Sequence, residues 1–294
     1  MTSMENGEAI AEIAALREEL VAQVSRPIQW PEPQLVLNLA SRRGSELRMF
    51  KHLQQVTMFH RENFASSNQV RHLYLVDGFL AMATAQNPFA LYGLARSMFE
   101  LSAFLHEIQR RLREVTFRVT EKNWIASGEQ FFGLIVRARV ATTHPKFHEL
   151  LRAEGVAKDH LKPFNSKHCI QEIAKEPGYE DAVERYDLLC DFVHHNLGGA
   201  TLANSGSEET EFVRTPGGGG IMSPNGPMTS TRYEYPVEAK GHRAVDELAP
   251  GFLKDARACI DWINSIPAGP FPTEMIIEKT GTQFGAPLLS PLSN

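Results

Sequence analysis

The segment with the clearest chemical potential is residues 186–196, YDLLCDFVHHN, where two histidines and an asparagine end an amphipathic stretch. Asp191 precedes His194 by three positions and His195 by four, so on a helix its carboxylate can reach either imidazole. A carboxylate bound to one ring nitrogen fixes the tautomer and raises the basicity of the other nitrogen. This pattern suits general acid–base catalysis or metal ligation, and Asn196 adds a polar amide at the same end.

The same residues also fit a structural role. A histidine near a helix C-terminus is favoured by the helix dipole alone. Asn196 followed by Leu197-Gly198-Gly199 is also common at the C-terminal end of a helix. The sequence therefore leaves two interpretations of this end open, a functional site and a helix cap.

A second candidate feature lies in residues 88–114, the most hydrophobic long segment of the chain. Its first half is apolar on nearly every side, which predicts a helix at the centre of a bundle. Arg96 and Glu100 interrupt that apolar half with the spacing of one helical turn. A buried charged pair is costly unless it is partnered. Two arrangements are possible: the two side chains pair with each other, or they meet the end that carries His194 and Asn196.

The segments ARSMFELSAFLHEI (95–108) and YDLLCDFVHHN together resemble a group of bacterial helical proteins of unknown function. These proteins carry an Arg-Ser…Glu helix and a later Tyr…Leu-Cys/Ser…Phe-Val-His-Pro-Asn helix end. The group is similar in layout to the HEPN superfamily of helical bundles, many of which are RNases in toxin–antitoxin and anti-phage systems. The resemblance covers about residues 70–200. It implies a metal-independent RNase or a defence-related protein, and the matching positions are Arg96, Ser97, Glu100, His194 and Asn196.

The chain departs from these patterns at two points. His195 stands where the group usually has proline. The HEPN RNase motif is an arginine, four to six residues and a histidine, whereas Arg185 lies nine positions before His194. In the RNase hypothesis His194 acts as a general base or acid on the ribose 2′-hydroxyl, and Arg96 or Arg185 stabilises charge on the phosphate.

Other functions remain open from the sequence, and so does the question of whether the chain is an enzyme. A basic run could hold an RNA backbone, although a solvated helix face is the favoured interpretation of it. The main alternative is a non-catalytic helical module that binds a protein partner or a second copy of itself. The basic run consists of Arg110, Arg111, Arg113, Arg118 and Lys122.

A metal site in the bundle is the least favoured alternative. Bundle di-iron sites usually contain two Glu-x-x-His motifs, and this chain offers a single Asp-x-x-His. We therefore predict neither a metal nor another cofactor. The residues that such a site would use are Glu100, His106, Asp191, His194 and His195.

Composition points to a globular protein without a membrane span. The chain has 294 residues, 43% of them hydrophobic, and a formal net charge of −5. An acidic balance argues against a surface built throughout to hold nucleic acid. Three widely spaced cysteines without a CxxC pair fit a reducing compartment, and the N-terminal segment lacks the apolar core of a secretory signal. We expect a cytoplasmic protein.

Hydrophobic periodicity predicts an all-α fold, a multi-helix bundle. Two boundaries have specific signals: SSN at 66–68 predicts a helix break, and Asn87-Pro88 predicts a helix start. The region between residues 146 and 178 reads as shorter helices. The expected longer helices are 8–24, 34–64, 69–86, 88–114, 118–141, 179–195 and 239–265.

The chain divides into an N-terminal helix with its linker (1–30), a bundle domain (31–266) and a Pro-rich tail (267–294) that we expect to be flexible. A Gly/Pro-rich insertion at 200–236 precedes the last bundle helix. Within it, EFVR at 211–214 and RYEYPV at 232–237 could form a small β-hairpin.

Overall fold

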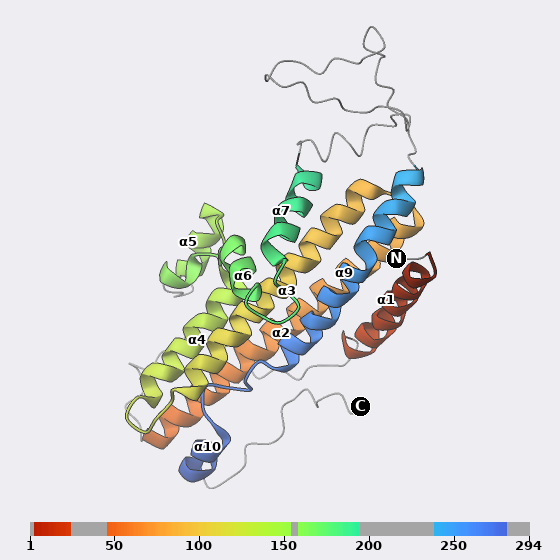
Figure 1. Ribbon diagram of the computed structural model, residues 1–294. Helices are drawn as coiled ribbons and strands as arrows, with labels where there is room; N and C mark the ends of the chain where they lie inside the picture. Colours follow the sequence, from red (N-terminus) through yellow and green to blue (C-terminus); the bar gives the residue numbers. More distant parts are fainter. Residues whose placement is uncertain (1–2, 25–45, 154–157, 195–237, 281–294) are drawn as a thin grey trace, which may run out of the picture.

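The computed structural model describes residues 3–24, 46–153, 158–194 and 238–280 (Figure 1). Within these ranges every regular element is a helix, which confirms the predicted all-α fold. The hairpin predicted at 211–214 and 232–237 lies outside the described residues.

Four long helices run along a common axis and form the body of the bundle (Figure 1). The helix α3 is central, as its apolar sequence predicts, because it packs against α2, α4 and α9 and also against the shorter α6 and α7. The long helices are α2 (Glu46–Thr84), α3 (Pro88–Phe117), α4 (Trp124–Val140) and α9 (Glu238–Asn264).

Shorter helices cover this body. The helix α1 (Ser3–Val24) packs against α2 and α9, and α7 (Ala182–Val193) packs against α3 and α6. The helix α5 follows α4 in the chain, and a short 3-10 helix, η1, packs against both α4 and α5. The remaining bounds are α5 (Pro145–Ala153), η1 (Lys158–Leu161), α6 (Ser166–Ile173) and α10 (Thr273–Thr280).

The start of α3 follows directly from its sequence. Asn87 has an extended backbone, with φ −95° and ψ 96°, and its side chain accepts a hydrogen bond from the backbone N–H of Ala90 at 3.2 Å. Pro88 occupies the first helical position, where its missing N–H costs nothing. The predicted boundary is confirmed, and it fixes where α3 places Arg96 and Glu100.

The predicted break at residues 66–68 is wrong, because α2 continues through it. Ser67 Oγ and Asn68 Nδ2 donate hydrogen bonds to the backbone carbonyl of Phe64, at 3.0 Å and 2.8 Å. Serine and asparagine often cap helices because they bond to nearby backbone groups. Here those bonds go to a carbonyl within the same helix, and the buried neighbours Phe64 and Ala65 hold the segment in the core.

The expected flexible tail also needs correction, because part of residues 267–294 packs against the bundle. Phe271 is buried, and its ring stacks on that of Phe50 with centroids 4.2 Å apart. Met275 and Ile276 of α10 join the same small cluster. Burial of the aromatic and apolar residues of this segment stabilises its packed conformation despite its prolines and glycines. Residues 281–294 lie outside the described part.

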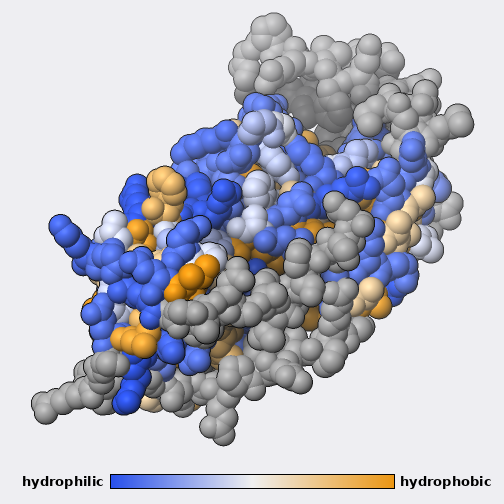
Figure 2. All heavy atoms as spheres, turned by 90° about the horizontal axis from the view of Figure 1, so that it is seen from below, coloured by the Kyte–Doolittle hydropathy of each residue, from blue (hydrophilic) through white to orange (hydrophobic). Residues whose placement is uncertain are grey.

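The surface of the bundle is largely hydrophilic on the face shown in Figure 2, where hydrophobic residues form small, separate patches. None of the described helices combines the length and the apolar composition needed to cross a lipid bilayer.

Candidate functional site

The structure brings Arg96 and Glu100 of α3 together with Tyr186 of α7 and His194 at its end. Glu100 Oε1 accepts hydrogen bonds from Tyr186 Oη at 2.9 Å and from Arg96 Nε at 3.2 Å. Arg96 Nη2 also lies 3.5 Å from Tyr186 Oη, and Arg96 Nη1 lies 3.2 Å from His194 Nε2. We call these four residues the arginine–histidine cluster.

His194 lies at the end of α7 and also contacts the central helix. The helix α7 ends at Val193, and His194 follows with an extended backbone at φ −87° and ψ 166°. Its backbone N–H donates to the carbonyl of Cys190 at 3.0 Å, so the main chain completes the last turn of the helix. Its exposed side chain turns to Arg96. His195 and Asn196 lie outside the described residues, and their site roles stay predictions.

The contact between Arg96 and His194 constrains the imidazole. A guanidinium group can only donate hydrogen bonds. The contact at 3.2 Å is therefore a hydrogen bond only when His194 Nε2 is unprotonated and carries its lone pair. In this state the imidazole is a potential base whose accepting nitrogen already faces a fixed cation.

Glu100 and Tyr186 set the electrostatics around that cation. Partial burial and the hydrogen bond to Glu100 raise the pKa of Tyr186 to about 12, so its hydroxyl stays protonated at neutral pH. Although partial burial lowers the pKa of Arg96, the bond to Tyr186 and the charge of Glu100 outweigh it and raise the pKa above its usual value. The Tyr186 ring also lies beside the guanidinium, with its centroid 5.6 Å from Arg96 Cζ.

The two arrangements predicted for Arg96 and Glu100 occur together. Their side chains form an ion pair one helical turn apart, and Arg96 still reaches the end of α7. Asp191 lies exposed on α7, and its predicted partnership with the histidines stays a prediction. Ser97, another position of the resembling group, donates its hydroxyl to the backbone carbonyl of Gly93 at 2.9 Å.

Arg185, the other arginine considered for phosphate contact, occupies a different place. Its Nη2 donates to Asp255 Oδ1 at 3.0 Å, and its Cζ lies 3.9 Å from the centroid of the Phe99 ring. Burial raises the pKa of Asp255 to about 6, an effect that the charge of Arg185 opposes. Arg185 is therefore engaged with α9 and the core, which leaves Arg96 as the arginine beside His194.

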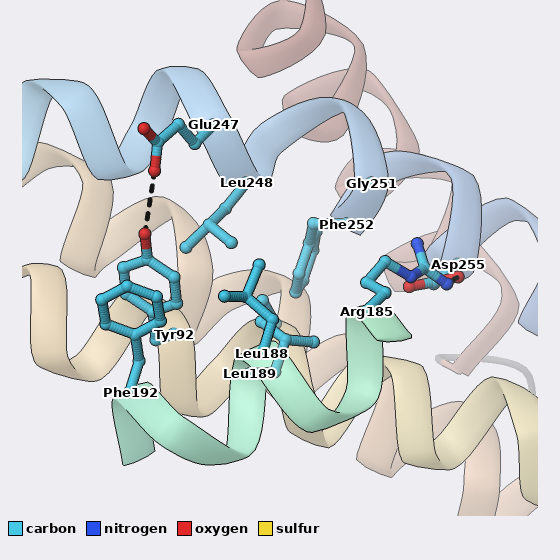
Figure 3. A pocket seen from close by; sticks show the side chains of 11 residues that line it. Tyr92, Arg185, Leu188, Leu189, Phe192, Glu247, Leu248, Gly251, Phe252 and Asp255 are labelled. Atoms are coloured by element: carbon cyan, nitrogen blue, oxygen red, sulfur yellow. Dashed lines mark hydrogen bonds and ion pairs between the residues drawn. The ribbon is translucent and has the colours of Figure 1, made fainter. Parts of the chain in front are cut away.

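A groove of about 400 Å³ lies between α3, α7 and α9 (Figure 3). Its walls are mainly apolar side chains, such as Leu188, Phe192 and Phe252. A polar pair closes each end: Tyr92 Oη donates to Glu247 Oε2 at 2.9 Å, and the pair of Arg185 and Asp255 stands opposite. Because the charged groups at its ends are paired, we consider the groove a weaker candidate for a catalytic site than the arginine–histidine cluster.

Three of the five cations of the predicted basic run, which extends from α3 to just beyond its end, pair with carboxylates of the same chain. Arg110 and Arg111 both pair with the buried Glu107, at 2.9 Å and 2.5 Å. Arg118 pairs with Glu114 at 2.5 Å. A surface run that is paired internally offers less net attraction to an RNA backbone than its sequence suggests.

The residues considered for a metal site do not all meet. His106 is buried, with its Nε2 3.0 Å from Glu176 Oε1 and its ring against Trp262. In the described part of the chain, no three or more His, Cys, Asp or Glu side chains gather in a way that could hold a metal ion.

Tyr186 was not among the candidate site residues selected from the sequence, although it belongs to the cluster. A signal was present, since tyrosine is part of the helix-end pattern of the resembling group. Within α7, Leu189 is buried, whereas Val193 is 39% exposed. Phe192 packs inward instead, stacked on Tyr92 with ring centroids 4.1 Å apart.

Comparisons with known proteins assign no family to this chain: no protein-family model, curated protein or solved structure matches it.

Proposed function

We propose that the arginine–histidine cluster binds and cleaves an RNA phosphodiester without a metal ion, as in a HEPN-like helical bundle with an RNase or defence-related role. The observation that carries this proposal is the contact of 3.2 Å between Arg96 Nη1 and His194 Nε2. It supplies, from two helices, the cation and the base that the HEPN motif places on one helix.

The proposed reaction is an internal transfer of the phosphoryl group. His194 Nε2 takes the proton of the ribose 2′-hydroxyl, and the 2′-oxygen attacks the adjacent phosphorus. The bond to the 5′-oxygen breaks, water supplies a proton to that oxygen, and the products are a 2′,3′-cyclic phosphate and a 5′-hydroxyl. Arg96 stabilises the negative charge that develops on the phosphate oxygens.

Substrate binding would itself free the base. In the unliganded cluster Arg96 donates to His194 Nε2. A phosphate oxygen is a stronger acceptor for a guanidinium than a neutral imidazole, because the bond is charge-assisted on both sides. When a phosphate takes over Arg96, the lone pair on His194 becomes available to the 2′-hydroxyl.

Glu100 and Tyr186 act as positioning residues in this proposal. Glu100 Oε1 holds Arg96 Nε, and Tyr186 Oη holds Glu100 from the other helix. These bonds keep the Nη1 edge of the guanidinium directed toward His194. Fixed geometry of this kind reduces the reorganisation needed during the reaction.

Labelled RNA incubated with the purified protein in EDTA tests the proposal. A matched substrate carries a single 2′-deoxy nucleotide at the cleavage position. We expect cleavage of the RNA with cyclic phosphate ends, and no cleavage at the deoxy position. Cleavage that continues at that position, or that is abolished by EDTA, contradicts the proposed chemistry.

We also infer a second candidate function, a non-catalytic module that binds a protein partner, because α5 shows an exposed apolar face. Phe147 and Leu150 are 56% and 62% exposed and lie three residues apart, on one side of the helix. None of the residues of α5 is buried. Exposed apolar faces of this kind are typical of docking surfaces.

Light scattering on the intact protein and on a Phe147→Ser/Leu150→Ser variant tests this second function for self-association. A concentration-dependent dimer that the variant loses favours the module. An unchanged monomer in both proteins contradicts self-association through α5.

A further inference from the structure

A second pocket, of about 370 Å³, lies between α2, α4, α6 and the segment that precedes α6. Three arginines line it: Arg71 from α2, and Arg137 and Arg139 from α4. Polar side chains accompany them, namely Ser67, Asn68 and Ser166, of which Ser67 and Asn68 also donate to the backbone carbonyl of Phe64. We call this site the three-arginine pocket.

The positive charge of the pocket is not balanced within the described part of the chain. No ion pair there joins Arg71, Arg137 or Arg139 to a carboxylate. Glu100 contributes an acidic side chain to the lining. Its Oε1, however, is bonded to Arg96 and Tyr186, so Arg96 already offsets its charge.

Arg137 is held in place without a counterion. Its Nε donates to the carbonyl of Lys162 at 2.8 Å, its Nη2 lies 3.3 Å from the carbonyl of Pro163, and its Cζ lies 4.3 Å from the centroid of the Phe164 ring. Arg139 Nη1 contacts His60 Nδ1. Arg137 is thus held by backbone carbonyls and an aromatic ring, as in a preorganised site for a negative ligand.

The direction of the pKa shifts separates these arginines from the paired ones. Burial lowers the pKa of Arg139, and burial together with the charge of Arg111 lowers that of Arg137. For Arg110 the same burial effect is overcome by the carboxylates of Glu107 and Glu172, and its pKa is raised. A cation whose charged form is disfavoured gains most from a bound anion.

We propose that the three-arginine pocket binds a phosphate group. Several guanidinium groups that line one concave space suit the oxygens of a phosphate group, which accept charge-assisted hydrogen bonds. The helix α6 begins at Ser166 in the lining, and its positive dipole end adds to the attraction. This proposal does not depend on cleavage by the arginine–histidine cluster.

Isothermal titration with inorganic phosphate, at ionic strength held constant with chloride, tests the proposal on the intact protein. Arg71→Gln is the first variant, because Arg71 is exposed and its loss should leave the fold unchanged. We expect saturable binding by the wild type and a loss of affinity of about tenfold or more in the variant, since one charge-assisted bond is removed. Arg113→Gln, an exposed arginine of α3 outside the pocket lining, is the matched control and should bind phosphate like the wild type.

The same titration distinguishes the sources of the phosphate group. Binding of a nucleoside 5′-monophosphate or a short RNA more tightly than inorganic phosphate assigns the pocket to nucleotides, whereas equal affinity assigns it to free phosphate. The proposal is overturned if the wild type shows no binding at phosphate concentrations up to about 10 mM. An equal loss in Arg113→Gln also overturns it, because the effect is then one of net charge. Arg139→Gln should repeat the loss seen with Arg71→Gln, and melting curves verify that both variants are folded.

Discussion

Arg96 and His194 are separated by 98 residues along the chain, yet Arg96 Nη1 lies 3.2 Å from His194 Nε2. The contact joins the middle of the central helix α3 to the residue that ends α7. It joins the two segments, residues 95–108 and 186–196, from whose sequence a HEPN-like protein is predicted. The same arginine also contacts Glu100 and Tyr186, so the end of α7 is tied to α3 through three side chains.

Replacing Tyr186 with phenylalanine should loosen the cluster while keeping its ring beside Arg96. The change removes the hydroxyl that donates to Glu100. We expect a loss of about 1 kcal/mol in the free energy of unfolding, because one hydrogen bond to a partly exposed carboxylate is lost. RNA cleavage should fall by about tenfold, as expected when a group that orients the catalytic cation is removed.

Tyr74→Phe is the matched control, since Tyr74 is 72% exposed. Urea denaturation and cleavage assays on both variants measure the difference. Equal behaviour of the two variants would show that the Tyr186 hydroxyl does not position Arg96.

His72→Leu should stabilise the protein, and more so in acid. His72 is fully buried, and neither ring nitrogen has a hydrogen-bond partner within the described residues. Burial lowers its pKa from 6.5 to about 4, so below pH 6.5 the unfolded chain takes up a proton that the folded protein excludes. The stability of the wild type should therefore fall, relative to the variant, as the pH decreases from 6.5 toward 4.

Chemical denaturation of both proteins at pH 7 and pH 5 measures this effect. We expect the stability gap between the variant and the wild type to widen by about 2 kcal/mol over that interval. All other titrating groups are common to the two proteins. A gap that is independent of pH would contradict the neutral, buried state of His72.

Arg185→Met should destabilise the protein in a manner that depends on pH. The change leaves the buried Asp255 without its guanidinium partner, which typically costs about 3 kcal/mol when the carboxylate is charged. Because the pKa of Asp255 is raised to about 6 in the folded protein, its carboxyl group is mostly protonated at pH 5 and mostly ionised at pH 7. Its contribution to stability therefore decreases as the pH rises from about 4 to about 6.

The cost of Arg185→Met should accordingly be smaller at pH 5 than at pH 7, as measured by denaturant unfolding. Adding Asp255→Asn to that variant should recover part of the loss at pH 7, because no charge is then left unpaired. A cost that is equal at both pH values would contradict the coupling of Arg185 to Asp255.

Phe271→Ala should lower the free energy of unfolding by about 3 kcal/mol, the usual cost of deleting a buried phenylalanine ring. Phe271 is 4% exposed and stacks on Phe50. Phe117, which is 92% exposed, provides the matched Phe→Ala control and should change stability by less than about 0.5 kcal/mol. If the two variants unfold alike, the segment before α10 is loosely held, as its sequence alone suggested.

The sequence predicted those features, such as the start of a helix, that depend on residues close together in the chain. Asn87 and Pro88 define the start of α3 because a cap needs only the next few residues. Local signals failed where packing in the core determines the structure. Ser67 and Asn68 are typical of a helix break, yet α2 continues through them. Local signals also failed for the segment around Phe271, whose partner Phe50 is distant in sequence.

The candidate site was predicted in its parts but not in its assembly. Arg96, Glu100 and His194 could be selected because of their residue types and helical spacing. Their meeting depends on how α7 packs against α3, which no local pattern encodes. The three-arginine pocket was missed for the same reason, since Arg71 and Arg137 belong to helices far apart in the sequence.

The most direct test of the central claim is a double-mutant cycle on RNA cleavage with Arg96→Gln and His194→Asn, in EDTA and with folding verified by circular dichroism. If the two side chains act as one site, each single variant should lose about a hundredfold or more in rate. The double variant should then lose little beyond the larger single effect. A wild type that does not cleave RNA, or single variants that cleave as fast as the wild type, would contradict the claim.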